Sequence, residues 1–183
     1  IWMRLLQQVP GSVLWLLKAN ADAYANLQRE AQSRGVDPAR LVFAARVPLA
    51  EHLARHRLAD LFLDTLPCNA HTTASDALWA GLPVLTCLGE TFAGRVAASL
   101  LRAAGLPELV TTCLADYETL ALRLARDPHT LAALRRRLQA QRDRCPLFDT
   151  RRFCEHLESA YQTMYQNHQH GHMPQSFSVE AGA

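Results

Sequence analysis

The residues with the clearest chemical potential lie in one short segment, CNAHTTASDALWAG, at positions 68–81. It places His71, Thr72 and Thr73 where a helix is expected to begin, and Asp76 about one turn later. The first backbone N–H groups of a helix lack internal partners and carry the positive end of the helix dipole, so this end favours an anion. Hydroxyls there add donors for phosphate oxygens, and the aspartate can accept hydrogen bonds from a ribose diol. The segment therefore predicts a diphosphate clamp beside a sugar-binding carboxylate.

The same residues also have a purely structural interpretation. Threonine is a common N-cap, and an acidic side chain in the first turns of a helix complements its dipole. The spacing of Thr72, Thr73 and Asp76 fits both interpretations, so residue types alone leave the clamp and the cap open.

Two histidine groups raise the question of a metal. His52 and His56 lie four residues apart on one helix face, but the Glu of the HExxH motif is absent and Cys68 is the only soft ligand nearby. We expect one of these histidines to be exposed and the other to lie at the edge of a ligand site. HQHGH at 168–172 falls in a polar tail and has no partner motif. The sequence therefore predicts no bound metal and no other cofactor.

The segments around the clamp predict the fold that positions it. Uniformly apolar strands that alternate with helices indicate an α/β fold with a Rossmann-like parallel sheet covered on both faces. In such sheets ligands bind beyond the carboxyl ends of the strands, which is where HTT follows the strand LFLD. Strands are expected at 12–17, 41–45, 61–64 and 83–86, and helices at 22–34, 50–58, 71–81, 94–105, 116–127, 128–144 and 150–166.

Domain organisation and composition narrow the class of protein. We expect one lobe over residues 1–166, whose N-terminus is the end of a helix already under way, and a mobile polar tail over 167–183. A net charge of +2 argues against nucleic acid, and no apolar run is long enough for a membrane span. The five cysteines form no CxxC pair, which fits reduced thiols and a cytoplasmic location.

The pattern LDT-x-x-x-N-x-HTT-x-x-D-x-LW-x-G-x-P, followed by GET-x-x-x-RVA, is long and specific. Over about residues 4 to 166 the chain resembles the catalytic region of the protein O-GlcNAc transferases and their SPINDLY-like relatives. The resemblance implies the C-terminal, nucleotide-sugar-binding lobe of a GT-B glycosyltransferase, followed by C-terminal helices. It also implies inverting, metal-independent transfer of GlcNAc from UDP-GlcNAc to Ser or Thr of proteins.

Carried over by position, the resemblance assigns roles to the clamp. Thr72 and Thr73 match the threonines that bind the phosphates, and His71 matches a histidine beside the diphosphate. Asp76 matches the acid that holds the ribose. These roles agree with the chemistry expected from the residue types, and they favour the clamp over the simple cap.

The resemblance places the nucleobase near the preceding helix. His52 matches a histidine close to the nucleotide, and the backbone from Ala45 to Val47 would face the uracil edge. One departure matters, because the lysine that packs on the base in the animal family members is Leu49 here. A related transferase that uses GDP-fucose or UDP-glucose therefore stays open as an alternative.

The resemblance also implies parts that lie outside this sequence. In the family the catalytic base belongs to an N-terminal lobe, and tetratricopeptide repeats grip protein substrates. We therefore expect no catalytic residue within these 183 residues, a first strand of the lobe that is missing, and no turnover by the chain alone. A non-catalytic nucleotide-binding module is the third interpretation.

Overall fold

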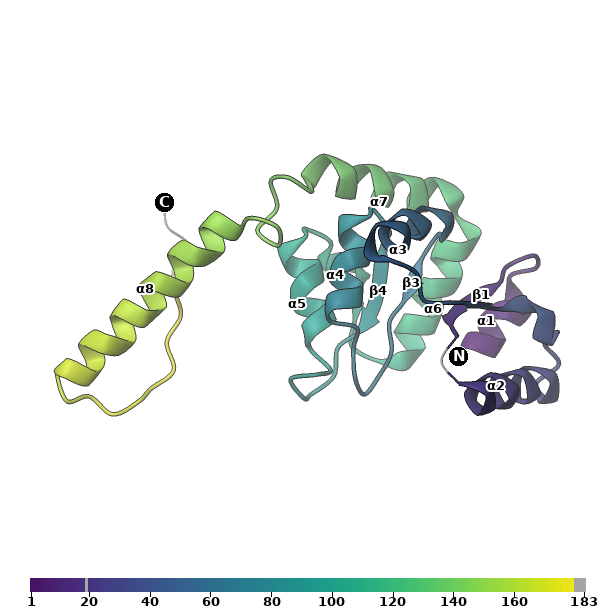
Figure 1. Ribbon diagram of the computed structural model, residues 1–183, viewed down its shortest axis with the longest axis horizontal. Coiled ribbons are helices and arrows are strands. Elements are labelled where there is room, and N and C mark those ends of the chain that lie inside the picture. The colour runs from purple at the N-terminus through teal and green to yellow at the C-terminus, as the bar shows by residue number, and fades with distance from the viewer. Residues whose placement is uncertain (19, 180–183) are drawn as a thin grey trace.

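The computed structural model describes residues 1–18 and 20–179, and it has an α/β architecture. Figure 1 shows the strands alternating with helices in the first part of the chain, followed by the helices α6 to α8. The α-helices are α1 (Trp2–Gln8), α2 (Ala21–Ser33), α3 (Leu49–Arg55), α4 (Thr72–Trp79), α5 (Val96–Ala103), α6 (Leu114–Arg126), α7 (Pro128–Gln141) and α8 (Thr150–Gln169). The strands are β1 (Leu14–Leu17), β2 (Leu41–Ala44), β3 (Phe62–Leu63), β4 (Val84–Cys87) and β5 (Val110–Thr111).

A parallel sheet in the order β3-β4-β5 forms the centre of the larger part of the molecule. Every residue of β4 is buried, because helices cover both faces of the strand. Val84 packs into a core with Ala74, Ala77 and Leu78 of α4 and Leu101 of α5. Leu85 and Cys87 pack on the other side against Tyr117 and Ala121 of α6. This two-sided burial explains why β4 reads as a continuous apolar run.

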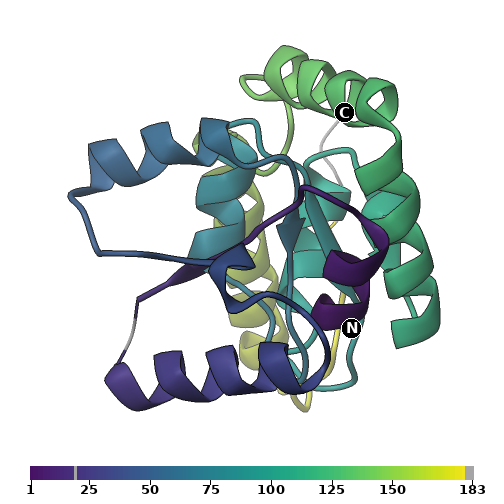
Figure 2. The ribbon, with the colours of Figure 1, turned by 90° about the vertical axis from the view of Figure 1, so that its right-hand side faces the viewer.

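The strands β1 and β2 form a second parallel sheet, with Leu14 opposite Leu41 and Leu17 opposite Ala44. Helix α2 covers this pair with the face predicted from its periodicity. Ala31 is fully buried and the Tyr24 ring lies 4.3 Å from that of Phe43. Helix α2 lies at the bottom and α7 at the top of the molecule in both views (Figure 1, Figure 2). The parallel strands were expected in one sheet, whereas their hydrogen bonds divide them into two.

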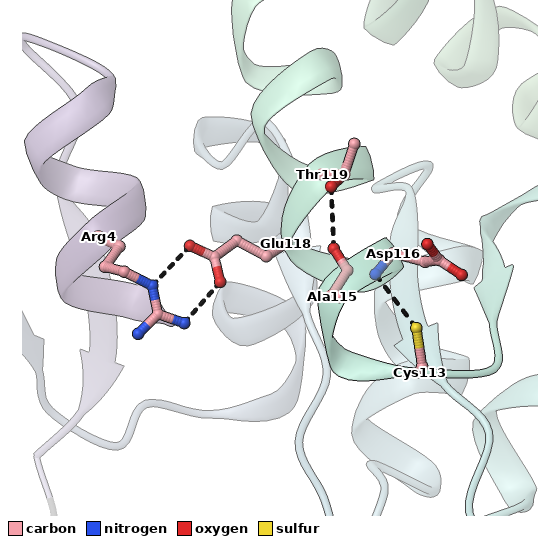
Figure 3. A network of polar contacts seen from close by, with 6 residues as sticks. All are labelled: Arg4, Cys113, Ala115, Asp116, Glu118 and Thr119. Carbon is pink, nitrogen blue, oxygen red and sulfur yellow. Dashed lines mark hydrogen bonds and ion pairs between the residues drawn. The ribbon is translucent and has the colours of Figure 1, made fainter.

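Helix α1 joins the two sheets. Its neighbouring residues Leu5 and Leu6 enter different cores, one with α6 and one with α2 and β2. On its surface Arg4 donates two hydrogen bonds to the carboxylate of Glu118 on α6, at 2.7 and 2.6 Å (Figure 3). The hydrogen bond from Arg4 lowers the pKa of Glu118. The two sheets and the helices packed on them are thus held together by helix α1 as well as by the chain that connects them.

Most element boundaries differ from the expected ones by one to three residues, and three differences matter most for the comparison. Strand β3 has two residues instead of four, although the N–H of Asp64 still donates to the carbonyl of Leu85 in β4 at 3.0 Å. The short strand β5 was not predicted. Helix α8 runs to Gln169, three residues past the expected end, so the polar tail begins later than residue 167. Residues 180–183 of the predicted tail lie outside the described residues, and the mobility of the tail stays a prediction.

Helix α8 differs from the other long helices. None of its residues is buried, and it projects from the rest of the molecule (Figure 1). Within the described ranges, no helix has both the length and the apolar character needed to cross a membrane.

Candidate functional site

The predicted clamp begins helix α4 at the carboxyl end of strand β3. His71 occupies the N-cap position, and Thr72 and Thr73 are the first two helical residues. The first helical hydrogen bond runs from the N–H of Ser75 to the carbonyl of His71 at 3.1 Å, which leaves the preceding N–H groups for other partners. Both threonines are exposed, and within the described part of the chain no side chain caps this helix. The threonines are therefore not N-caps, and their side chains are accessible to an anion.

The buried side chain of Asp64 holds the loop that leads into α4. One carboxylate oxygen accepts a hydrogen bond from the N–H of Ala70 at 2.6 Å, and the other accepts one from the Thr86 hydroxyl at 2.6 Å. The backbone carbonyl of Asp64 accepts a bond from the Tyr117 hydroxyl at 2.9 Å. Burial raises the pKa of the Asp64 carboxyl, whereas the hydrogen bonds from Thr86 and Ala70 and the charge of the nearby His71 lower it. A buried acid therefore ties the loop to strand β4 and helix α6.

A second loop, after β4, closes against the first. The N–H of Asn69 donates to the carbonyl of Ala93 at 2.8 Å, and its side-chain amide donates to the carbonyl of Thr65 at 2.9 Å. A Cβ added to Gly94 would lie 3.1 Å from the carbonyl oxygen of Pro67, so a larger residue would require the two backbones to move apart by a few tenths of an ångström. Both loops lie at the same end of the sheet (Figure 1).

His71 lies between these loops. It is half-buried, its Nε2 lies 3.4 Å from the carbonyl oxygen of Ala93, and its ring meets the Phe92 ring edge to face at 6.2 Å. Phe92 is 83% exposed. The imidazole is therefore placed at the mouth of the site and not in the core.

The predicted nucleobase edge follows β2. Ala45 and Val47 are exposed, and Arg55 donates to the Ala45 carbonyl at 2.8 Å. Arg55 also reaches Nδ1 of His52 at 2.7 Å and lies over the ring of Trp15 at 5.8 Å. One arginine on α3 thus fixes both the loop after β2 and the orientation of His52.

His52 connects this edge to the clamp. Burial lowers the pKa of His52, the charges of His56 and Arg55 lower it further, and the Asp76 carboxylate raises it. The influence of the Asp76 carboxylate on this pKa links α4 to α3 through charge.

The histidine pair does not have the predicted exposure. His56 is buried, and its Nδ1 lies 2.7 Å from the backbone carbonyl oxygen of His52, so the expectation of an exposed member is wrong. This contact holds the ring against α3, and the ring also packs edge to face on that of His52, with the centroids 4.6 Å apart, where α3 passes into a 3-10 turn. Among the described residues no three His, Cys, Asp or Glu side chains gather as a metal site requires. Metal independence stays a prediction.

Two residues of this region were missed from sequence. Asp64 was treated only as the end of a strand, although an acid at the end of an apolar strand is itself unusual. Arg55 was not considered, although it lies one helical turn after His52 and therefore shares its face. The binding roles of His52, His71, Thr72, Thr73 and Asp76, and of the backbone at Ala45 and Val47, stay predictions.

Curated relatives match nearly all of the chain. The Arabidopsis thaliana protein "Probable UDP-N-acetylglucosamine--peptide N-acetylglucosaminyltransferase SEC" is 42% identical over 97% of this chain, which covers 18% of the relative. A Caenorhabditis elegans UDP-N-acetylglucosamine--peptide N-acetylglucosaminyltransferase is 38% identical over 93% of the chain, which covers 15% of it. The chain therefore spans less than a fifth of the length of these relatives.

A solved structure gives the same result. A lysine-to-methionine mutant of the Thermobaculum terrenum O-GlcNAc transferase superimposes with a TM-score of 0.85 and 37% sequence identity, over 91% of this chain and 32% of that one. This likeness confirms the predicted fold class, the α/β lobe of a GT-B glycosyltransferase. The family model described as glycosyl transferase family 41 matches residues 1–157. On the motif around HTT, the fold and these matches, the chain belongs to glycosyl transferase family 41, which confirms the resemblance to the O-GlcNAc transferases and SPINDLY-like proteins.

Proposed function

We propose that this chain is the donor-binding lobe of an inverting glycosyltransferase that moves GlcNAc from UDP-GlcNAc to Ser or Thr of proteins. The observation that carries the proposal is the uncapped, accessible start of α4, where Thr72 and Thr73 are exposed at the carboxyl end of the sheet. The names of the relatives, which act as UDP-N-acetylglucosamine--peptide N-acetylglucosaminyltransferases, support this donor and acceptor.

The chemistry follows from charge. When the acceptor hydroxyl attacks the sugar, the glycosidic bond breaks and negative charge grows on the UDP leaving group. Backbone N–H groups and hydroxyls already aimed at the diphosphate stabilise that charge more strongly in the transition state than in the ground state. Thr72 and Thr73 would supply these donors with His71 at the mouth, and Asp76 would act in binding the ribose.

The wider setting belongs to the same proposal. The general base is assigned to an N-terminal lobe, and the protein acceptors to tetratricopeptide repeats in the full-length protein. We further propose a cytoplasmic location and a reaction that needs no metal. The chain by itself is then expected to bind the nucleotide without turning over.

The test replaces both threonines in the full-length protein. Thr72→Ala with Thr73→Ala should reduce transfer on the order of a hundredfold or more, because each lost donor in such a site costs roughly that factor. Transfer is measured by the mass of a modified acceptor peptide. Thr119→Ala is the matched control, since the Thr119 hydroxyl only bonds the Ala115 carbonyl of its own helix (Figure 3). Full activity in the double variant would refute the assignment.

A second donor is favoured by one observation. Leu49, at the first position of α3, is 64% exposed where the animal relatives are expected to carry a lysine against the base. A panel of UDP-GlcNAc, UDP-glucose and GDP-fucose separates the alternatives. Transfer from GDP-fucose with UDP-GlcNAc ignored would favour the rival donor. UDP binding by the full-length protein with no transfer from any donor would favour a non-catalytic module.

A further inference from the structure

A buried carboxylate lies under the proposed clamp without belonging to it. Asp64 is 5% exposed, and it is an acid surrounded by the apolar strands β3 and β4. Burying an acid is costly unless each oxygen finds donors, and here one oxygen binds the N–H of Ala70 and the other binds Thr86. An alanine at this position would avoid the cost of burying a carboxyl group. The presence of an acid therefore suggests that its hydrogen bond to the loop serves a purpose beyond packing.

We propose that Asp64 is a positioning residue, whose carboxylate fixes the direction of the N–H groups and hydroxyls at the start of α4. The proposal rests on the proposed function, and it names the part of the fold that sets the clamp. Ala70 lies two residues before Thr72, so fixing its N–H fixes the peptide groups through which the chain enters the helix.

The carboxylate is itself held by the core. Thr86, which donates to it, is fully buried in β4, and the Thr86 carbonyl accepts a hydrogen bond from the Thr111 hydroxyl at 3.0 Å. The Tyr117 hydroxyl fixes the Asp64 backbone from α6 at 2.9 Å. The start of α4 is thereby connected through Asp64 to β4, β5 and α6.

Two other roles give different outcomes. If Asp64 only stabilised the fold, its loss would lower the amount of folded protein without changing how folded molecules discriminate UDP from uridine. If it acted through space as a negative charge, removing it would strengthen binding of the anionic diphosphate. A positioning role alone predicts weaker binding of the diphosphate with unchanged binding of the nucleoside.

The experiment measures the affinities of the full-length protein for UDP and for uridine by calorimetry. Asp64→Ala should lower the UDP-to-uridine affinity ratio about tenfold, since the N–H of Ala70 loses its charged acceptor, with uridine affinity unchanged. Asp64→Asn keeps an oxygen for Ala70 and should restore most of the ratio. Asp60→Asn is the matched control, because the Asp60 side chain is 87% exposed and its carboxylate lies 3.7 Å from the guanidinium of Arg135.

The outcomes separate this inference from the proposed function. If the wild-type protein binds UDP and uridine with nearly equal affinity, both the proposed function and the positioning role are overturned. A high wild-type ratio that persists in Asp64→Ala, or rises, would overturn only the positioning role. Should Asp64→Ala fail to fold, Thr86→Val decides, because it frees one carboxylate oxygen and leaves the bond to Ala70. It should lower the ratio about two- to threefold, and an unchanged ratio would overturn the inference.

Discussion

The two loops that flank the proposed site are held in opposite ways. The loop after β3 is anchored from inside, by the buried Asp64 and its partners in β4 and α6. The loop after β2 is held from outside, by the half-exposed Arg55 on α3. A buried, charge-assisted anchor leaves little freedom, whereas a surface arginine can rearrange. We therefore expect the proposed phosphate side of the site to be rigid and the proposed base side to adjust.

The largest expected effect breaks the inner anchor. Asp64→Ala leaves the N–H of Ala70 and the Thr86 hydroxyl unpaired in the core, and it should lower the free energy of unfolding by about 3 kcal/mol. Urea denaturation of the chain measures this. Asp60→Ala, at an exposed position, should change it by less than about 0.5 kcal/mol. Equal effects of the two substitutions would contradict the inner anchor.

Removing the contacts of Arg55 should have a smaller effect than removing Asp64, and it should act on ligand binding more than on stability. Arg55→Ala releases the carbonyl of Ala45 and the His52 ring, so it should weaken uridine and UDP binding alike, by about threefold, with a stability loss of about 1 kcal/mol or less. Arg55→Lys keeps the positive charge but cannot contact the Ala45 carbonyl and the His52 ring together. Its affinities should therefore lie between those of the wild type and those of Arg55→Ala. Calorimetry checks the affinities. A selective loss for UDP would show that the arginine serves the phosphate side instead.

The smallest effect concerns protons on the base side. The pKa of His52 should lie below its ordinary 6.5, mainly because of burial, and NMR titration of its ring measures this. Because the folded pKa is the lower one, the unfolded chain binds more protons in this window, so stability falls as pH drops from about 6.5 through the folded pKa. Arg55→Ala should raise the pKa of His52 by removing a positive charge. A pKa above 6.5 would contradict the packing described for this edge.

The sequence predicted the parts that depend on neighbouring residues. Helix α2 has its expected face because Leu27 and Ala31 repeat with the period of the helix. The site at the start of α4 followed from His71, Thr72 and Thr73 in one run after an apolar strand, and the resemblance rested on the same run.

The missed parts depend on residues distant in sequence. Asp64 binds Thr86, 22 positions away, and Tyr117, 53 positions away, and no local pattern marks such partners. Strand β5 has only two residues, Val110 and Thr111, which is too short for a period to appear. His56 is buried where α3 passes into a 3-10 helix, a change that the apolar pattern does not encode.

The most direct test of the central claim is a crystal structure of the full-length protein with UDP. The account predicts diphosphate oxygens within about 3 Å of the N–H groups and hydroxyls of Thr72 and Thr73, with the loop from Asp64 to His71 unchanged. A diphosphate bound elsewhere, with the start of α4 in contact only with solvent, would contradict it.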